Sequence, residues 1–400
     1  MQNYINEFFN NLQIWEDYQG NKYKDRIYNS LSSFIFQPNV QTATLVYQEF
    51  FSTYWIGIQQ LKNPFVELIE MVRKYEFNAG KLLLNHRDHY IHSVNVFILG
   101  LAIFSRNSNF RSVVTKYVMY PDSYSTHYEE FFYRWGLCSL FHDIAYPLEI
   151  TYKQANEYIR FIHNYPKGHF LTQPTIEINL PFFEQLVNIP IIKPSSQYSS
   201  EFYNDYPDLK DPYTNSLDLL AQKLASCFNI NLTLIKDNLF QFVDIMKKRG
   251  FIDHGYYSSL IMLQWYHSLI TNTSWHPAYF YYPIVDSSSS ILLHNYYKQV
   301  LMKPPFNLGL LNPNQHPLAF LLMLCDELQD WNRKTYGEND NQFNYPIDIN
   351  FTVNDDIISA IYIFTKGSDN KPFIDNKKAI INSTLDTQSI IKNILISSIN

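Results

Sequence analysis

Cysteine and glycine are scarce in this chain, which has 3 cysteines and 11 glycines in 400 residues. The cysteines, at positions 138, 227 and 325, are too few and too widely separated for a disulfide framework or a cysteine-based zinc cluster. Sparse cysteine of this kind favours a reducing compartment, so we expect a cytoplasmic protein.

Basic charge and long apolar runs are also lacking. Lys and Arg number 31 against 37 Asp and Glu, and the formal net charge is -6. This balance argues against duplex nucleic acid as a partner and favours a small anionic ligand. The longest apolar stretch, near residues 94–104, is too short to span a bilayer, so no membrane partner is expected. A homo-oligomer is compatible with the sequence.

What the chain does contain is helical periodicity. From about residue 27 to residue 140, apolar residues recur at a spacing of three and four, which is typical of amphipathic helices. Over residues 164–213 prolines recur and this period is lost, which predicts a long irregular insertion, either a functional lid or padding. The fold class we expect is mainly α, with one helical domain over residues 1–344 and a small α+β appendage over residues 345–400.

Further helices follow from periodicity and from residues that begin or end helices. They are expected over residues 152–163, 216–228, 236–249, 256–269, 288–302 and 318–333. Asp253 is placed to cap the helix over 256–269, and Gly250 is placed to end the one before it. Pro317 should begin the last of these helices, and Pro147 should end the helix before residue 152.

The appendage shows a different period. Apolar and polar residues alternate over residues 347–353 and again over 361–364, and Asn354-Asp355 lies between the two runs. This pattern predicts a β-hairpin. We expect a closing helix over residues 387–398.

The dipeptide His142-Asp143 is the most informative motif. It ends the apolar segment 131–141, where an imidazole and a carboxylate could both reach one metal ion. Taken alone, either residue could equally be hydrogen-bonded within a core. The pair gains weight from other candidate ligands late in or close to apolar helical runs, which are His92, His254, His294 and Asp326.

Spacing aims two of these side chains at the interior. Asp326 continues the apolar stripe of Leu322 and Met323, and a buried carboxylate must be paired, hydrogen-bonded, protonated or bound to a metal. His92 begins an apolar stripe of its own helix. That helix is expected to include His89, which could replace His92 as a ligand because it lies three residues earlier.

Imidazole and carboxylate ligands suit divalent Mn, Fe, Ni, Co or Zn. Two such ions, bridged by Asp143, would provide a hydroxide near neutral pH and bind phosphoryl oxygens, as phosphoester hydrolysis requires. The alternatives for His254 and His294 are a hydrogen bond at a helix start and a buried polar position. The sequence leaves one metal or two open.

His92, the segment Phe141-His142-Asp143-Ile144-Ala145 and Asp326 together resemble the HD-domain superfamily of phosphohydrolases and cyclic-nucleotide phosphodiesterases, over about residues 87–331. The resemblance implies an all-helical HD core with two metal ions bridged by Asp143. The ligands that it implies are His92, His142, Asp143 and Asp326 for the first ion, with His254 and His294 for the second.

The chain departs from the HD-GYP phosphodiesterases of this superfamily at two points. Ala145-Tyr146 stands where those proteins carry Gly-Lys, so a lysine expected to contact phosphate is missing. The interval from Asp143 to His254, 254 − 143 = 111 positions, is also longer than in compact members.

The resemblance therefore favours a metal-dependent phosphohydrolase that cleaves a phosphoester of a nucleotide or cyclic nucleotide by attack of metal-bound hydroxide. Phosphatase and phosphodiesterase activity are both open. The residues expected to assist Asp143 as general acids or as orienters of its neighbours are Asp88, Glu149, Glu327 and Asp330, and those expected to contact phosphate are Arg87, Lys153 and Arg333. Two alternatives remain, which are a di-iron oxygenase of the same fold and a non-catalytic nucleotide-binding module.

Overall fold

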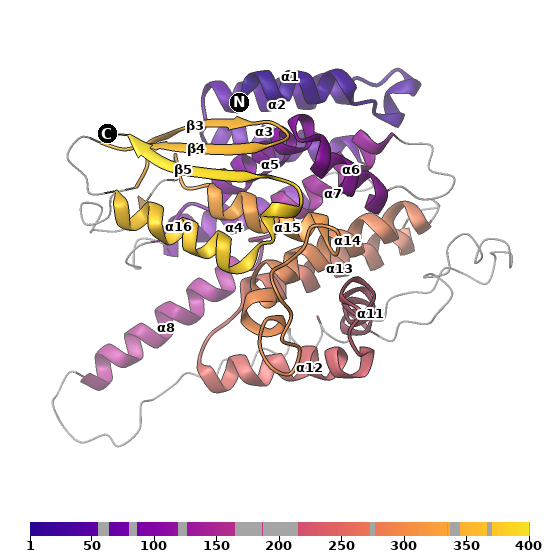
Figure 1. Cartoon of the computed structure of the whole chain (residues 1–400). Helices are drawn as coiled ribbons and strands as arrows, with labels where there is room; N and C mark the ends of the chain where they lie inside the picture. The colour runs from indigo at the N-terminus through magenta and orange to yellow at the C-terminus, as the bar shows by residue number, and fades with distance from the viewer. Residues whose placement is uncertain are drawn as a thin grey trace, which may run out of the picture.

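The computed structural model describes residues 1–54, 64–79, 86–118, 126–164, 186, 215–272, 277–333, 335–336, 345–365 and 370–399. These residues are mainly helical, with a small three-stranded sheet near the C-terminus (Figure 1). The insertion expected over 164–213 lies outside the described residues apart from residues 164 and 186. The division expected at residue 344 stays a prediction.

The helices of the first half are α1 (Gln2–Asn11), α2 (Tyr23–Phe36), α3 (Val40–Thr53), α4 (Pro64–Ala79), α5 (Tyr90–Arg106), α6 (Ser108–Val118), α7 (His127–Phe141) and α8 (Tyr146–Asn164). Those of the second half are α11 (Ser216–Phe228), α12 (Leu232–Arg249), α13 (His254–Asn272), α14 (Pro277–Tyr296), which continues as the π-helical turn η4 (Tyr297–Leu301), α15 (Pro317–Leu328) and α16 (Lys371–Thr384). Short 3-10 turns form η1 (Trp15–Gln19) and η5 (Thr387–Ser389).

Several helix ends follow the expected chemistry. The side chain of Asn215 accepts a hydrogen bond from the backbone of Asp218 at the start of α11, as an N-cap does. Asp253 caps α13 by accepting from the backbone N–H of Tyr256 at 2.8 Å. Gly250 ends α12 with φ of 67°, a left-handed conformation that glycine adopts without strain.

The central pair of helices is α5 and α7. Every residue of α5 from Tyr90 to Ser105 is buried, so other elements surround this helix on all sides. Gly100 of α5 lies against the ring of Trp135 of α7, and the indole N–H of Trp135 donates to the Phe97 carbonyl at 2.8 Å. The start of α5 lies beside the end of α7, since the ring centres of His92 and His142 are 5.4 Å apart.

Some helix boundaries differ from expectation. α5 begins only at Tyr90, because the preceding residues form the short strand β1 (His86–Arg87), which pairs with β2 (Thr335–Tyr336). His89 is therefore the residue before the helix and not part of it. α7 already ends at Phe141, and Pro147 lies in the first turn of α8, where a proline needs no hydrogen-bonded N–H.

The last two long helices of the helical region are also shifted. α15 ends at Leu328, because Gln329 takes an extended conformation, so the helix ends five residues before the expected residue 333. α14 begins at Pro277, before the expected start at residue 288, and contains Pro283. Within this helix the buried Ser290 donates to the backbone carbonyl of Asp286 at 2.8 Å.

The C-terminal region forms a mixed sheet. Strands β3 (Asp348–Val353) and β4 (Ile357–Ile363) pair antiparallel, which confirms the expected hairpin, and β5 (Asn393–Ile399) pairs parallel to β4. The closing helix expected over residues 387–398 is wrong, since residues 393–398 belong to a strand and only residues 387–389 form a short 3-10 turn. Burial alternates along this strand as its side chains point to opposite faces of the sheet, and Ile396 is buried. The helix of this region is instead α16, which makes the crossover between the parallel strands.

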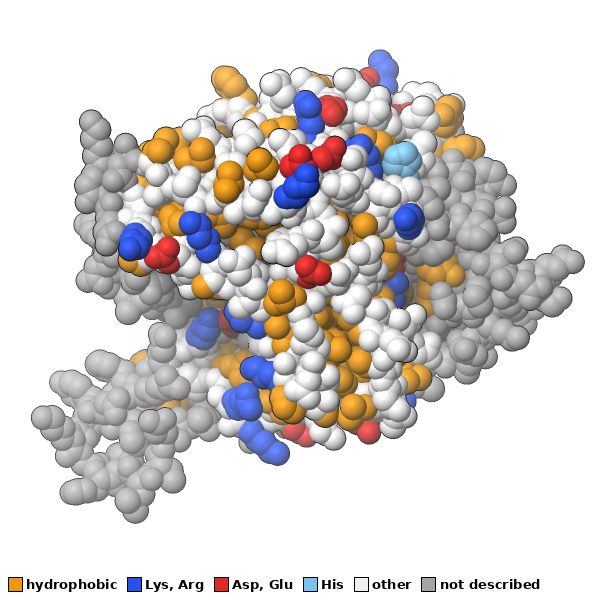
Figure 2. Space-filling view, in the orientation of Figure 1, with side chains coloured by type: hydrophobic (Ala, Val, Ile, Leu, Met, Phe, Trp, Pro, Cys, Tyr) orange, Lys and Arg blue, Asp and Glu red, His pale blue; other side chains and the backbone are white. Residues whose placement is uncertain are grey.

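The surface of this region carries exposed aliphatic side chains. On the face shown in Figure 2, hydrophobic side chains lie over the sheet, and Ile347, Leu395 and Ile399 are each about half exposed. Among the described residues, no helix is both long and apolar enough to cross a membrane.

Candidate metal centre

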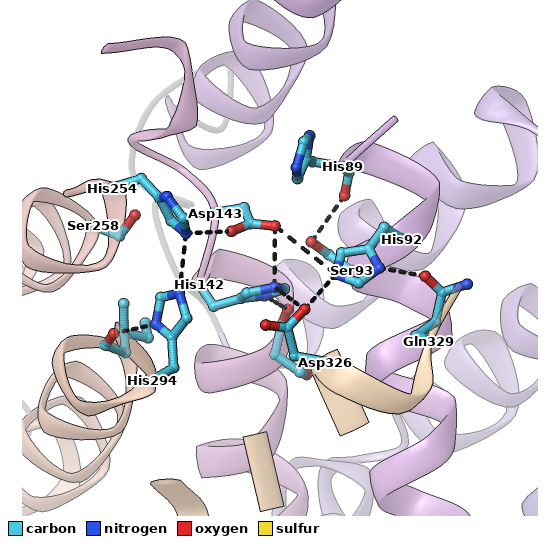
Figure 3. Close-up of polar contacts among 12 residues, drawn as sticks. His89, His92, Ser93, His142, Asp143, His254, Ser258, His294, Asp326 and Gln329 are labelled. Carbon is cyan, nitrogen blue, oxygen red and sulfur yellow. Dashed lines mark hydrogen bonds and ion pairs between the residues drawn. The ribbon is translucent and has the colours of Figure 1, made fainter. Parts of the chain in front are cut away.

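Six side chains from distant parts of the chain come together at one end of the α5–α7 pair. His92 lies in the first turn of α5, His142 and Asp143 directly follow α7, His254 begins α13, His294 lies near the end of α14, and Asp326 lies in the last turn of α15. Figure 3 shows these side chains directed toward a common centre. The six residues singled out from the sequence as candidate ligands are thus brought together.

The first group surrounds one oxygen of Asp143. His142 Nε2 lies 3.1 Å from Asp143 Oδ2, and His92 Nε2 lies 4.0 Å from the same atom. Asp326 Oδ1 completes the group, 2.9 Å from His92 Nε2 and 3.8 Å from His142 Nε2. Four donor atoms therefore lie within a few ångströms of one another.

The second group surrounds the other oxygen of Asp143. His254 Nε2 lies 3.2 Å from Asp143 Oδ1 and 3.1 Å from His294 Nε2. Asp143 therefore belongs to two overlapping triads, one with His92 and His142 and one with His254 and His294. These triads could hold one or two metal ions.

The other ring nitrogen of each histidine is held by an acceptor. The Nδ1 atoms of His92, His142, His254 and His294 face, respectively, Gln329 Oε1, the Ser139 carbonyl at 2.8 Å, Glu149 Oε2 at 2.6 Å and the Ile291 carbonyl. Because carbonyl and carboxylate oxygens only accept, each Nδ1 must carry a proton. The Nε2 atoms are therefore available as ligands, and this arrangement is usual for metal-bound histidines.

Such a cluster needs positive charge at its centre. The Nε2 atoms of His254 and His294, at 3.1 Å, require a proton or a cation between them. The Nε2 atom of His142 is buried and, among the described residues, has no hydrogen-bond partner of acceptable geometry. Imidazole nitrogens with carboxylate oxygens are the donor set of Zn, Mn, Fe, Co and Ni sites, so the residues present fit a divalent metal.

Electrostatics within the cluster point the same way. Burial would lower the pKa of His142, but the carboxylates of Asp143 and Asp326 raise it to about 10. Burial and the neighbouring His254 lower the pKa of His294 to about 4. Although burial opposes it, the pKa of Asp143 lies well below its ordinary value because His142 is adjacent. The carboxylates are therefore ionised at neutral pH and attract a cation.

Two members of the cluster are partly exposed. His92 and His142 are fully buried, whereas the side chain of Asp326 is 35% exposed and that of His254 is 17% exposed. A ligand from solvent would therefore approach past Asp326 and His254.

The other residues predicted from the sequence surround this cluster. Asp88 is buried, and its carboxylate accepts from the backbone of Ile91 at 2.8 Å. Arg333 Nε donates to the Asp88 carbonyl at 3.1 Å, and after burial its charge is the main cause of the lowered pKa of His92. Asp330 lies between Lys377, at 2.5 Å, and Arg333, at 3.9 Å. Their catalytic and phosphate-binding roles stay predictions.

Lys153 and Arg87 are the other two residues expected to contact phosphate. Lys153 forms an ion pair with Glu149, the carboxylate that holds His254, so it is one residue removed from the cluster. The side chain of Arg87 lies outside the described part of the structure. His89 directs its Nδ1 to Glu76 Oε1 at 2.7 Å, and His92 is the histidine of this segment that joins the cluster.

Three supporting residues were not identified from the sequence. Gln329 holds His92, and its own side-chain N–H donates to the Trp331 carbonyl at 2.7 Å, which fixes the amide orientation. Ser258 accepts from the backbone of Ala145 at 3.0 Å and so holds the turn after Asp143. Gly255 leaves room for His294. None of the three carries a sequence signal, because each acts on a residue that is distant in the chain, namely His92, Ala145 and His294.

Comparison of the chain with protein-family models, with curated proteins and with solved structures finds no match. The fold and the site define a mainly helical protein with a buried His/Asp cluster that could bind metal. A more specific function must be inferred from the geometry of that cluster.

Proposed function

We propose that this protein is a metal-dependent phosphohydrolase of the HD type that cleaves a phosphoester of a nucleotide or cyclic nucleotide. The observation that carries the proposal is the orientation of the four imidazoles, since each has Nδ1 held by an acceptor and Nε2 directed to the centre. When bound there, divalent ions would activate water and offset negative charge on phosphoryl oxygens.

A positive charge near His92 supports an anionic substrate. Arg333 lies beside His92 with its side chain 13% exposed, and guanidinium groups bind phosphate oxygens through paired hydrogen bonds. Burial raises the pKa of Asp88, which suits a group that donates a proton to a leaving oxygen. Asp143 and Asp326 would hold the metal ions, and Arg333 would contact the phosphate.

Metal analysis of the purified protein combined with a hydrolysis screen tests this function. The substrates are bis(p-nitrophenyl) phosphate, nucleotides and cyclic dinucleotides. Asp143→Asn should lose metal from both triads and lose hydrolysis, because this carboxylate is shared between them. Asp237→Asn, at an exposed carboxylate of α12, is the matched control and should behave as wild type.

Two results would overturn the proposal. One is a metal-free protein with full activity, and the other is an Asp143→Asn variant as active as the Asp237→Asn control. Iron-dependent oxygen uptake without phosphoester hydrolysis would identify the oxygenase alternative, and nucleotide binding without turnover would identify a binding module.

A further inference from the structure

A buried lysine of the C-terminal region contacts the segment that follows Asp326. The Lys377 side chain, on α16, is only 5% exposed. Its ammonium donates to the Glu327 carbonyl, lies 3.3 Å from Glu327 Oε1 and lies 2.5 Å from Asp330 Oδ2. A buried ammonium is costly unless it is paired and hydrogen-bonded, and two carboxylates and a carbonyl meet that need.

A second contact joins the sheet to the same place. The hydroxyl of Tyr362, on β4, donates to the Leu328 carbonyl at 2.6 Å. Leu328 is the last residue of α15, so this carbonyl lacks a partner within the helix. The Lys377 ammonium also lies 5.9 Å from the centre of the Tyr362 ring. The sheet and α16 therefore hold the end of α15 together.

The segment held in this way supports the first metal triad. Gln329, directly after Leu328, faces His92 Nδ1 with its side-chain oxygen. Arg333, four residues later, donates to the Asp88 carbonyl just before α5. Asp330 links the two ends, because one carboxylate oxygen pairs with Lys377 and the other faces Arg333.

We propose that Lys377 is a positioning residue of the metal centre, which holds the segment 327–333 so that Gln329 orients His92 and Arg333 contacts the Asp88 carbonyl. The expected effect on metal affinity rests on the proposed function. The expected effect on the segment 327–333 does not depend on metal. The C-terminal region then supports the metal centre, although it contributes none of the six candidate ligands.

The test compares Lys377→Met with Lys378→Met, a neighbouring exposed lysine of the same helix. In metal-free protein, amides of residues 328–333 should exchange with solvent at least about tenfold faster in Lys377→Met than in wild type or Lys378→Met. Tyr362→Phe, which removes only the hydroxyl, should show a smaller increase. These exchange measurements need neither metal nor substrate.

Titration with Zn²⁺ or Mn²⁺ alone provides the second readout. In Lys377→Met, the affinity of the His92 triad for its ion should fall by about tenfold or more, as when a residue that orients a metal ligand is lost. The affinity of the His254 triad should equal that of wild type. Lys377→Arg should restore much of this affinity, because a guanidinium can also bridge two carboxylates.

The outcomes separate the two proposals. Wild-type protein that binds neither ion contradicts the proposed function, and the exchange comparison still decides the role of Lys377. Unchanged exchange of residues 328–333 in both Lys377→Met and Tyr362→Phe overturns the inference. Equal loss of both ions would also overturn it, since that result indicates general destabilisation.

Discussion

At the scale of the residue, metal and protons compete for the same atoms. The atom of His142 that could bind a metal is Nε2, because Nδ1 already donates to the Ser139 carbonyl. With its pKa raised to about 10 by Asp143 and Asp326 against the effect of burial, His142 carries an additional proton at pH 7 in the metal-free protein. A metal ion must displace that proton to bind.

Metal affinity is therefore expected to rise with pH. Displacement of one proton from a group whose pKa is about 10 strengthens apparent binding about tenfold per pH unit below that pKa. The pKa of His254 is also raised, because Asp143 and Glu149 outweigh burial, so a second proton makes the dependence steeper. Titration with Zn²⁺ against a competing chelator at pH 6, 7 and 8 measures the slope, and affinity independent of pH would contradict this prediction.

A second residue-scale prediction concerns Gly255, next to His254. A Cβ at this position would lie 2.6 Å from His294 Cε1 and 3.0 Å from the Ile291 carbonyl. Gly255→Ala should therefore displace the His294 ring. The metal affinity of the triad of Asp143, His254 and His294 should fall by about tenfold or more, as when a residue that supports a metal ligand is lost. Metal stoichiometry checks this, and Gly309→Ala, which meets no atom within 4 Å, is the control. Two tightly bound ions in Gly255→Ala would refute it.

The sequence is most informative about the ligands themselves. His142-Asp143, His92 and Asp326 could be selected because apolar spacing aims ionisable side chains at a core, where they need a partner. The supporting groups could not all be found in this way. Gln329 follows a helix whose end was expected five residues later, and Ser258 acts through a backbone N–H of a distant turn.

At the scale of the element, the centre depends on how closely α5 and α7 approach. Gly100 allows that approach, because a Cβ there would lie 2.1 Å from the Trp135 ring. Gly100→Ala should cost about 1–3 kcal/mol of the free energy of unfolding, as overpacking of a core does. It should also separate His92 from His142 and lower metal affinity.

Thermal or urea unfolding with metal absent measures the first effect, and ion titration measures the second. Gly309→Ala again serves as control, since its neighbourhood is open. A Gly100→Ala variant with wild-type stability would show that the indole can move aside.

Periodicity predicts helices and strands well where one face is buried. It predicts them less well where capping residues or tertiary contacts determine the type of the element or where it begins and ends. The helix over residues 216–228 was predicted at its observed bounds, and Asn215 caps it. The prediction of a helix was wrong for β5, because its strand conformation depends on pairing with β4, which the local sequence does not show. The start of α14 at Pro277 was not predicted either, because the helix contains Pro283 and a proline usually breaks or kinks a helix interior.

At the scale of the whole molecule, two clusters tie the helices together. One is a buried ion network in which Asp286 of α14 pairs with Arg134 of α7 at 2.9 Å and with Lys223 of α11 at 2.7 Å. The other is the candidate metal centre, whose side chains come from α5, α13, α14, α15 and the turn after α7. The ion network satisfies its charges internally, whereas the metal centre relies on protons or a cation.

Removal of metal is therefore expected to destabilise the whole protein. An ion that binds only the folded state stabilises it by about 2.7 kcal/mol when its free concentration is 100 times its dissociation constant. Chelation should lower the melting temperature, and re-addition of Zn²⁺ or Mn²⁺ should restore it. The shift should vanish in Asp143→Asn, because both triads share that carboxylate, and persist in Asp237→Asn. A chelator-induced shift of equal size in Asp143→Asn would place the stabilising ion elsewhere and contradict the assignment of the site.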